Sequence, residues 1–262
     1  MMELKSSEVS LVCQFNFKYD NNELDLILIR SIEVLFSIFN FTIKKICLSS
    51  IHGKIYRISH KKLNSILNDL NNEFKYINFR SDYNSGDFEP NTRFYVQLNK
   101  FKGLLKVSVI IKEQHLFDND FDMYKTIVEE LSKSNSYSFT GYSFYIPNYY
   151  GPVSFSFGIL RRTKMPKDML NLAQWYTKSN LIKSTIGYLN CFSNLSEYQI
   201  QFLIDTFGSD NVSRINNATI FRCNKAFLSD DASYFDSVEY AELCDKFEQE
   251  LPFVRNQYDS FL

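Results

Sequence analysis

The chain has 262 residues, a formal net charge of −1, 45% hydrophobic residues and 23% charged residues. This composition is typical of a globular protein and excludes an intrinsically disordered one. Only 8 glycines are present, whereas average usage of about 7% would give roughly 18. Glycine-rich loops that bind nucleotide phosphates are therefore disfavoured.

The most apolar stretch, residues 24–41, is interrupted by Asp25, Arg30 and Glu33. A membrane-spanning helix needs about 20 nearly uncharged residues, so this stretch predicts a buried helix. The first eight residues lack the basic head and apolar run of a secretory signal. We therefore expect a cytoplasmic protein that does not insert into a membrane.

Cysteine usage favours a reducing compartment. Five cysteines are scattered along the chain without a C-x-x-C spacing: Cys13, Cys47, Cys191, Cys223 and Cys244. An odd number of distant cysteines supports neither a disulfide framework nor a zinc site. We expect free thiols, no disulfides and no bound metal.

Hydrophobic periodicity predicts alternating strands and helices in the first half of the chain. Alternation predicts a strand at residues 10–18, followed by the apolar helix, which Asn21 or Asn22 can cap. A second strand is expected at 42–49, and a helix capped by Ser59 is expected to continue to Asn72.

A hairpin is expected next, with strands from Phe94 and up to Ile111 around a turn at Lys102 and Gly103. The following stretch, 121–132, has apolar residues at helical spacing. Residues 134–160 contain no charged side chain and nine Phe or Tyr, and we expect two core strands around a turn at 147–152.

In the last third, Pro166 is placed to begin a helix. Ser196 and Gln199 have the spacing of a capping box for another helix, which Gly208 can end. A strand is expected at 218–223 and a final helix at 235–251. Because no βαβ period recurs, we predict an α+β fold in which helices pack on a mainly antiparallel sheet. We expect a single domain over 1–262, with a possible subdivision near 161–165.

Charge is divided unevenly along the chain. Residues 1–183 hold 24 basic and 18 acidic side chains, whereas residues 184–262 hold 5 basic and 12 acidic ones. The balances are +6 and −7. Such polarity favours an electrostatically guided encounter with a partner.

Motifs for catalysis, phosphate binding and metal binding are absent. The acidic run 118–122, with Glu129, resembles a calcium loop, but Met123 stands where that loop needs glycine. We interpret the run as helix capping. His52, His60 and His115 have no cysteine nearby in sequence, and the loop carboxylates Asp82, Asp87 and Glu89 form no distinctive pair. We predict no catalytic residue and no cofactor.

Nucleic-acid binding is disfavoured although basic clusters occur at 44–45, 60–62, 100–106 and 161–167. Proteins that bind single strands combine aromatic and basic residues, and the aromatic segment 134–160 contains no basic residue. A pI near 6.3 points the same way.

The final helix carries the one surface hypothesis. Val238, Ala241, Cys244, Phe247 and Leu251 form an apolar stripe beside an acidic face. An acidic face of this kind can meet a basic cleft in a partner. The candidate partner-binding residues are Asp230, Asp231, Asp236, Glu239, Glu242, Asp245 and Glu248.

The second half resembles the immunity proteins of bacterial polymorphic-toxin systems, in particular the family numbered fifty-two. The resemblance lies in residues 142–157, 186–189, 195–197 and 212–223 and in the closing acidic helix. It implies a cytoplasmic, non-enzymatic protein that binds and neutralises a protein toxin, and it transfers no catalytic residue. Two alternatives stay open: a hydrolase or transferase without recognisable motifs, and a phage- or plasmid-encoded regulator that binds nucleic acid. The oligomeric state is left open.

Overall fold

The computed structural model describes residues 9–19, 22–81, 94–101, 103–111, 119–133, 137–147, 186–223 and 238–252. Several predicted features lie outside these residues. They are the Asn21 cap, the carboxylates Asp82, Asp87 and Glu89, His115, Asp118, the second aromatic strand, the 161–167 cluster, the helix at Pro166, and Asp230, Asp231 and Asp236.

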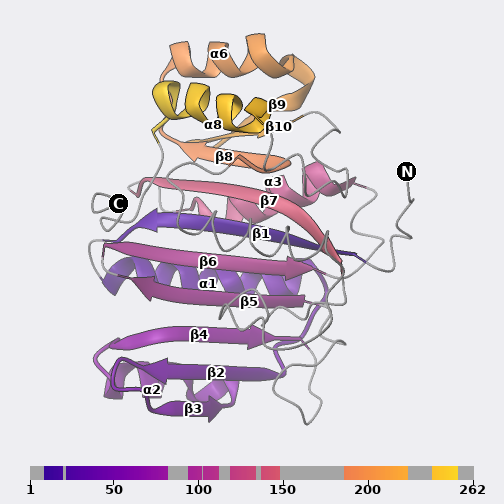
Figure 1. Cartoon of the computed structure of the whole chain (residues 1–262). Coiled ribbons are helices and arrows are strands. Elements are labelled where there is room, and N and C mark those ends of the chain that lie inside the picture. The colour runs from indigo at the N-terminus through magenta and orange to yellow at the C-terminus, as the bar shows by residue number, and fades with distance from the viewer. Residues whose placement is uncertain are drawn as a thin grey trace.

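The described strands form one ten-stranded sheet in the order β3-β2-β4-β5-β6-β1-β7-β8-β10-β9 (Figure 1). Every neighbouring pair is antiparallel. The strands are β1 (Val9–Lys18), β2 (Lys45–Ser50), β3 (Ile55–Ile58), β4 (Phe74–Arg80), β5 (Phe94–Phe101), β6 (Leu104–Ile111), β7 (Phe139–Pro147), β8 (Leu189–Ser193), β9 (Val212–Ile215) and β10 (Ala218–Arg222). The predicted α+β class with antiparallel sheet is confirmed.

Helices cover the two faces of the sheet at different places. They are α1 (Asn22–Ile38), α2 (Leu63–Asp69), α3 (Asp120–Leu131), α6 (Glu197–Phe207) and α8 (Val238–Glu250). In Figure 1, α1 lies behind β5 and β6, whereas α6 and α8 lie beside each other at the β9 end. Helices α1 and α3 contact each other along the same face.

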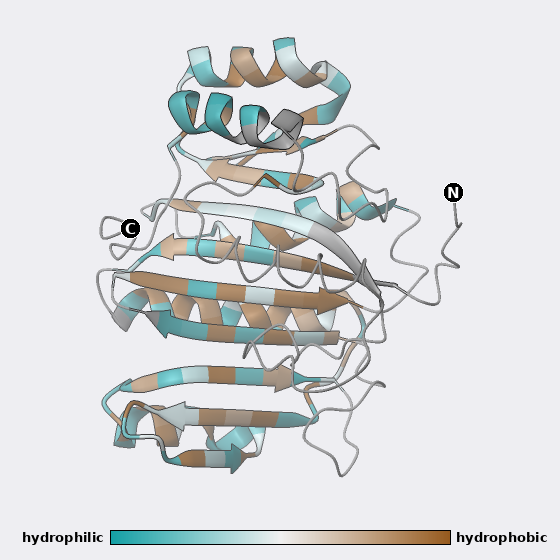
Figure 2. Ribbon diagram, in the orientation of Figure 1, coloured by the Kyte–Doolittle hydropathy of each residue, from teal (hydrophilic) through white to brown (hydrophobic). Residues whose placement is uncertain are grey.

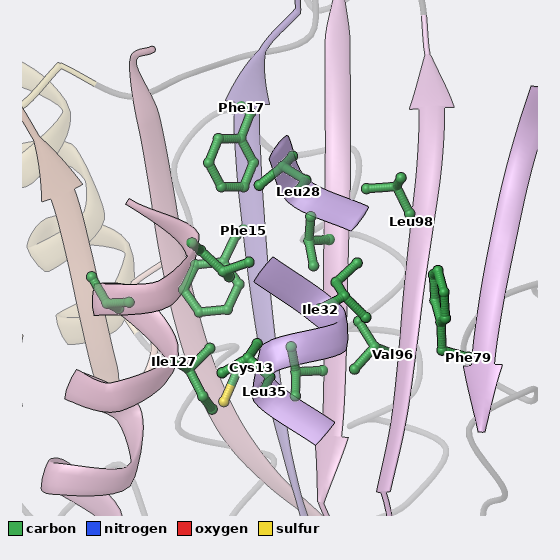
Figure 3. Packing of buried hydrophobic residues seen from close by; sticks show 14 of the residues in the cluster. Cys13, Phe15, Phe17, Leu28, Ile32, Leu35, Phe79, Val96, Leu98 and Ile127 are labelled. Atoms are coloured by element: carbon green, nitrogen blue, oxygen red, sulfur yellow. The ribbon is translucent and has the colours of Figure 1, made fainter. Parts of the chain in front are cut away.

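The main core lies between α1, α3 and one face of the sheet. Alternate residues of β1, among them Cys13, Phe15 and Phe17, are buried against Leu28 and Ile32 of α1 (Figure 3). Strands of this kind bury one side-chain face because successive residues point to opposite sides. Brown segments alternate with pale ones along these strands in Figure 2, as that geometry requires.

A second core lies on the opposite face, under α6 and α8. Phe192 of β8 and Phe221 of β10 pack there with Leu203 of α6 and Phe247 of α8. Residues Leu189 and Ile220 of the same two strands belong to the main core. Strands β8 and β10 are therefore buried on both faces, and the second core holds the acidic helix at one end of the sheet.

Locally encoded elements agree with the sequence predictions. The hairpin turns at Gly103, whose φ is +73°. Helix α6 begins with a capping box, in which Gln199 N donates to Ser196 Oγ at 3.3 Å and Ser196 N donates to Gln199 Oε1 at 2.9 Å. It ends at Gly208, whose N donates to Ile204 O at 2.8 Å.

Two predictions are corrected. Ser59 does not cap a helix through its side chain; it precedes a 3₁₀ turn (His60–Lys62), and α2 spans only Leu63–Asp69. Strand β4 is absent from the sequence prediction because a bulge inserts Lys75, so that buried Phe74 and Ile77 are three residues apart. A bulge breaks the two-residue period that identifies a strand.

Glycine at position 141 allows the central strands to pack closely. A Cβ at Gly141 of β7 would lie 2.4 Å from the Phe15 ring and 2.7 Å from Cys191 Sγ. Real Cβ atoms do not approach other atoms so closely. The glycine therefore makes room for the large Phe15 ring of β1 beneath α3, where it stacks on Tyr124 with 5.7 Å between ring centroids.

Candidate protein-binding surfaces

Among the described residues, strand order places a basic group of elements and an acidic group at opposite ends of the sheet. Residues 44–81, which build β2, β3, α2 and β4, carry eight Lys or Arg and two Asp or Glu, a balance of +6. Residues 186–223 and 238–252, at the other end, carry three basic and eight acidic side chains, a balance of −5. We call these the basic end and the acidic end. With nine strand spacings between β3 and β9, the two edges are about 43 Å apart.

Helix α8 forms part of the acidic end. Glu242 and Asp245 are exposed, whereas Glu248 is half-buried. Glu239 lies in the first turn of α8. Four of the seven predicted partner-binding residues thus share one helix, and the structure gives no position for the other three.

The buried side of α8 holds the acidic face in place. The Phe247 ring packs against three others at centroid distances of 5.5 to 5.8 Å, from Phe202, Phe207 and Phe221. Gln199 of α6 donates through Nε2 to the Glu250 carbonyl at 2.7 Å. Burial of Phe247 and Leu251 confirms the C-terminal part of the predicted apolar stripe.

Besides half-buried Glu250, the acidic end contains three exposed acids that the sequence prediction did not include: Glu197, Asp205 and Asp210. Arg214 of β9 pairs with Glu197 at 2.9 Å, and this exposed pair neutralises one of the three. These three acids were already among the twelve acidic residues counted after residue 183. Their placement beside α8 depends on the strand order.

At the basic end, the β2–β3 hairpin exposes two large apolar side chains. Ile51 is 53% exposed and Ile55 is 60% exposed. Lys54 lies between them in sequence, and its Nζ is 5.0 Å from the centroid of the Tyr56 ring. Lys61 and Lys62 follow in the exposed 3₁₀ turn. The hairpin therefore combines exposed apolar and cationic groups.

A polar row crosses the sheet on the face opposite α1. Strand register places the following residues side by side from β4 to β8: Asn78, Gln97, Ser108, Gln14, Tyr142 and Asn190. Gln14 and Asn190 are fully buried, and Tyr142 donates from its hydroxyl to Gln14 Oε1 at 2.7 Å. A buried polar row needs its partners in register, so it favours this strand pairing over a slipped one.

The predicted basic cluster at 100–106 is divided between the two faces. Lys100 points to the α1 face, where its ammonium pairs with buried Asp25 and donates to the Asn72 carbonyl at 2.8 Å. Lys106 lies on the opposite face, where burial lowers its pKa to about 7. The two lysines therefore do not form one cationic surface for phosphates.

The Asp25–Lys100 pair is part of the core. Lys100 Nζ lies 4.1 Å from the centroid of Phe74, and Asp25 is completely buried at the start of α1. Burial raises the pKa of Asp25 to about 6, while the hydrogen bond and charge of Lys100 act in the opposite direction. The pair connects α1 to β5, and Lys100 also contacts Asn72 and Phe74 of the basic end from the core side.

The thiols in the described residues are poor candidates for nucleophiles. Cys13, Cys191 and Cys223 are buried and free, and Cys47 is half-buried and free. Burial raises the pKa of Cys191 to about 12 and raises that of Cys13 as well. Nucleophilic cysteines need a lowered pKa, because the thiolate is the reactive form.

The acidic side chains Asp120 and Asp122 lie in the first turn of α3. Asp122 accepts from Asn119 Nδ2 at 2.6 Å and from Lys125 Nζ at 3.0 Å, and these bonds lower its pKa. Asn119, at the N-cap position, makes no side-chain bond to the helix backbone. The described residues contain no group of three or more metal-ligating side chains. His52 and His60 are exposed, and His60 Nε2 lies 2.7 Å from Glu33 Oε1.

Comparison with known proteins gives a fold relative only. No family model matches the sequence. The search of curated proteins also returned no match. Among solved structures, the Pseudomonas aeruginosa T6SS protein PA0821 is similar with a TM-score of 0.55 and 8% sequence identity. The similarity covers 94% of this chain and 90% of that protein.

At 8% identity the likeness shows that the two chains share a fold and shows no more than that. Within the described residues, none of the helices combines the length and apolar character that crossing a membrane requires.

Proposed function

We propose that this chain is a non-enzymatic immunity protein that binds and neutralises a protein toxin of an interbacterial competition system. The observation that carries the proposal is the acidic end, where α8 presents Glu242 and Asp245 on a helix anchored by Phe247. A fixed acidic surface suits a partner whose active-site cleft is basic, because complementary charge raises the association rate and occludes the cleft.

The fold relative supports the same context. PA0821 is a T6SS protein, and type VI secretion fits a role in competition between bacteria. The buried thiols of the described residues, with their raised pKa values, agree with a binding role. Both supports are independent of the charge argument.

A protection assay tests this function. Each gene adjacent to that of this chain is expressed in a sensitive bacterial host, with and without this chain. We expect one neighbour to arrest growth alone and to be tolerated when this chain is present. A purified mixture of the two should then elute as one complex. Growth arrest that persists in the presence of this chain contradicts the proposal.

Charge reversal locates the interface. The variant Glu242→Lys/Asp245→Lys reverses the exposed acids of α8 and leaves Phe247 in place. The matched control, Asp69→Lys/Glu73→Lys, makes the same change in net charge with exposed acids at the basic end. We expect the first variant to lose protection while it stays folded, and the control to keep it. Equal loss in both variants would contradict the acidic-end interface.

A further inference from the structure

The outer edge of β3 ends the sheet. Strand β3 pairs with β2 alone among the described strands. At the turn of this hairpin, Ser50 N donates to Lys54 O at 2.9 Å, and Gly53 has a φ of +81°. Hydrogen-bonded and non-hydrogen-bonded pairs alternate along an antiparallel ladder. The Ser49–Ile55 pair is therefore of the second kind, and the Ile55 N–H and C=O point away from β2.

Ile55 and Ile51 make this edge unusual. Natural proteins protect exposed edges with short strands, charges, proline or a covering element. Here the edge strand is short and flanked by cations, yet two isoleucines on the hairpin are more than half exposed. Their exposure places apolar contact area next to a backbone donor and acceptor.

The charge around the β3 edge limits which class of partner can bind there. The surrounding basic end carries a balance of +6, with Lys54, Lys61 and Lys62 on or beside the hairpin. A second copy pairing β3 to β3 would bring two such surfaces together, which is electrostatically unfavourable. Nucleic acid would use the lysines through its phosphates but would leave the exposed isoleucines and the open backbone unexplained.

We propose that the β3 edge binds an extended acidic segment of a protein partner, which adds a strand antiparallel or parallel to β3. The backbone of Ile55 supplies ladder hydrogen bonds, as in other β-augmentation complexes. Ile51 and Ile55 contact apolar residues of the segment, and Lys54 pairs with its carboxylates. This surface lies at the end of the sheet opposite α8 and is independent of the proposed toxin interface.

The probe is a short synthetic peptide in which glutamate alternates with valine and threonine. It is titrated into the uniformly ¹⁵N-labelled full chain while amide shifts and fluorescence anisotropy are recorded. We expect saturable binding with shifts concentrated at residues 50–58. A peptide with the same glutamates but proline at alternate positions should not bind, because proline has no N–H to donate.

Two variants and one control separate the contributions. Lys54→Glu should weaken peptide binding about tenfold through like-charge repulsion. Ile55→Thr, which keeps the strand propensity, should weaken it through lost apolar contact. Lys75→Glu makes the same change in charge at an exposed residue of β4 and should change affinity less than about twofold.

Three results would overturn the proposal. The first is the absence of shifts at residues 50–58 during the titration. The second is equal binding of the proline peptide, which would reduce the interaction to charge alone. The third is tighter binding of a single-stranded DNA oligonucleotide than of the acidic peptide at the same salt, which would assign the basic end to nucleic acid.

Discussion

The stability of the protein should fall as Asp25 ionises, because its pKa is raised from 3.8 to about 6 in the folded chain. At 1.36 kcal/mol per pKa unit, this difference corresponds to about 3 kcal/mol. The folded state holds the proton more tightly than the unfolded state. The contribution is therefore fully present below pH 3.8 and is lost as the pH rises through 6.

The variant Asp25→Asn isolates this contribution. It keeps the size of the side chain and removes its titration. The pH dependence that the other carboxyl groups contribute to the free energy of unfolding then cancels when the two proteins are compared. Urea unfolding of both proteins, measured from pH 4 to pH 8, gives the free energy of unfolding for each. We expect the value for wild type minus that for the variant to decrease by about 2 kcal/mol over this range, because part of the contribution is already lost at pH 4.

A difference that stays constant, or that grows with pH, would refute the reasoning. Growth with pH would mean that the attraction to Lys100 exceeds the cost of burying the Asp25 carboxylate. Lys100→Met provides the complementary control. It removes the compensating cation, so the titration of Asp25 should move to a higher pH.

Four further predictions concern packing, capping and thiols. Gly141→Ala should destabilise the chain by about 1–3 kcal/mol in thermal unfolding, because the new methyl group meets the Phe15 ring. Ser196→Ala should cost about 0.5–2 kcal/mol in the same measurement by removing the capping box of α6. Phe247→Ala should cost about 3–5 kcal/mol and increase proteolysis at α8. In thiol titration of the native protein, three buried cysteines should react only after unfolding: Cys13, Cys191 and Cys223. Rapid native labelling at all three, or unchanged stability in these variants, would contradict the described packing.

The sequence predicts those elements whose determinants are local. Ser196 and Gln199 lie in the same helical turn, and Gly103 supplies a positive φ in its hairpin. Periodicity likewise places Phe247 and Leu251 on the buried side of α8. In each case the residues that determine the structure lie within a few positions of one another, so a single sequence contains the information.

The sequence does not predict features that depend on residues far apart in the chain, such as strand β4 and the order of the strands in the sheet. Lys75 forms a bulge only because β2 lies opposite β4, so the alternation that identifies a strand is broken there. Strand β1 pairs with β6 and β7, both far away in the chain, and its own residues do not specify this order. Asp25 and Lys100 meet for the same reason.

The candidate site shows the same division. The sequence reveals the unequal charges of the two parts of the chain and the acidic face of α8. It does not reveal that the basic end and the acidic end of the described residues lie at opposite ends of one sheet, because that follows from strand order. The exposure of Ile51 and Ile55 follows from the edge position of β3 and has no local signature.

The most direct test of the proposed function is the association rate of this chain with the toxin that it is proposed to bind, measured at several salt concentrations. For the wild type, we predict fast association that slows steeply as salt increases. Glu242→Lys/Asp245→Lys should remove most of this salt dependence, whereas Asp69→Lys/Glu73→Lys should keep it. An association rate that is independent of salt in the wild type, or equally reduced in both variants, would contradict the assignment of the acidic end as the binding surface.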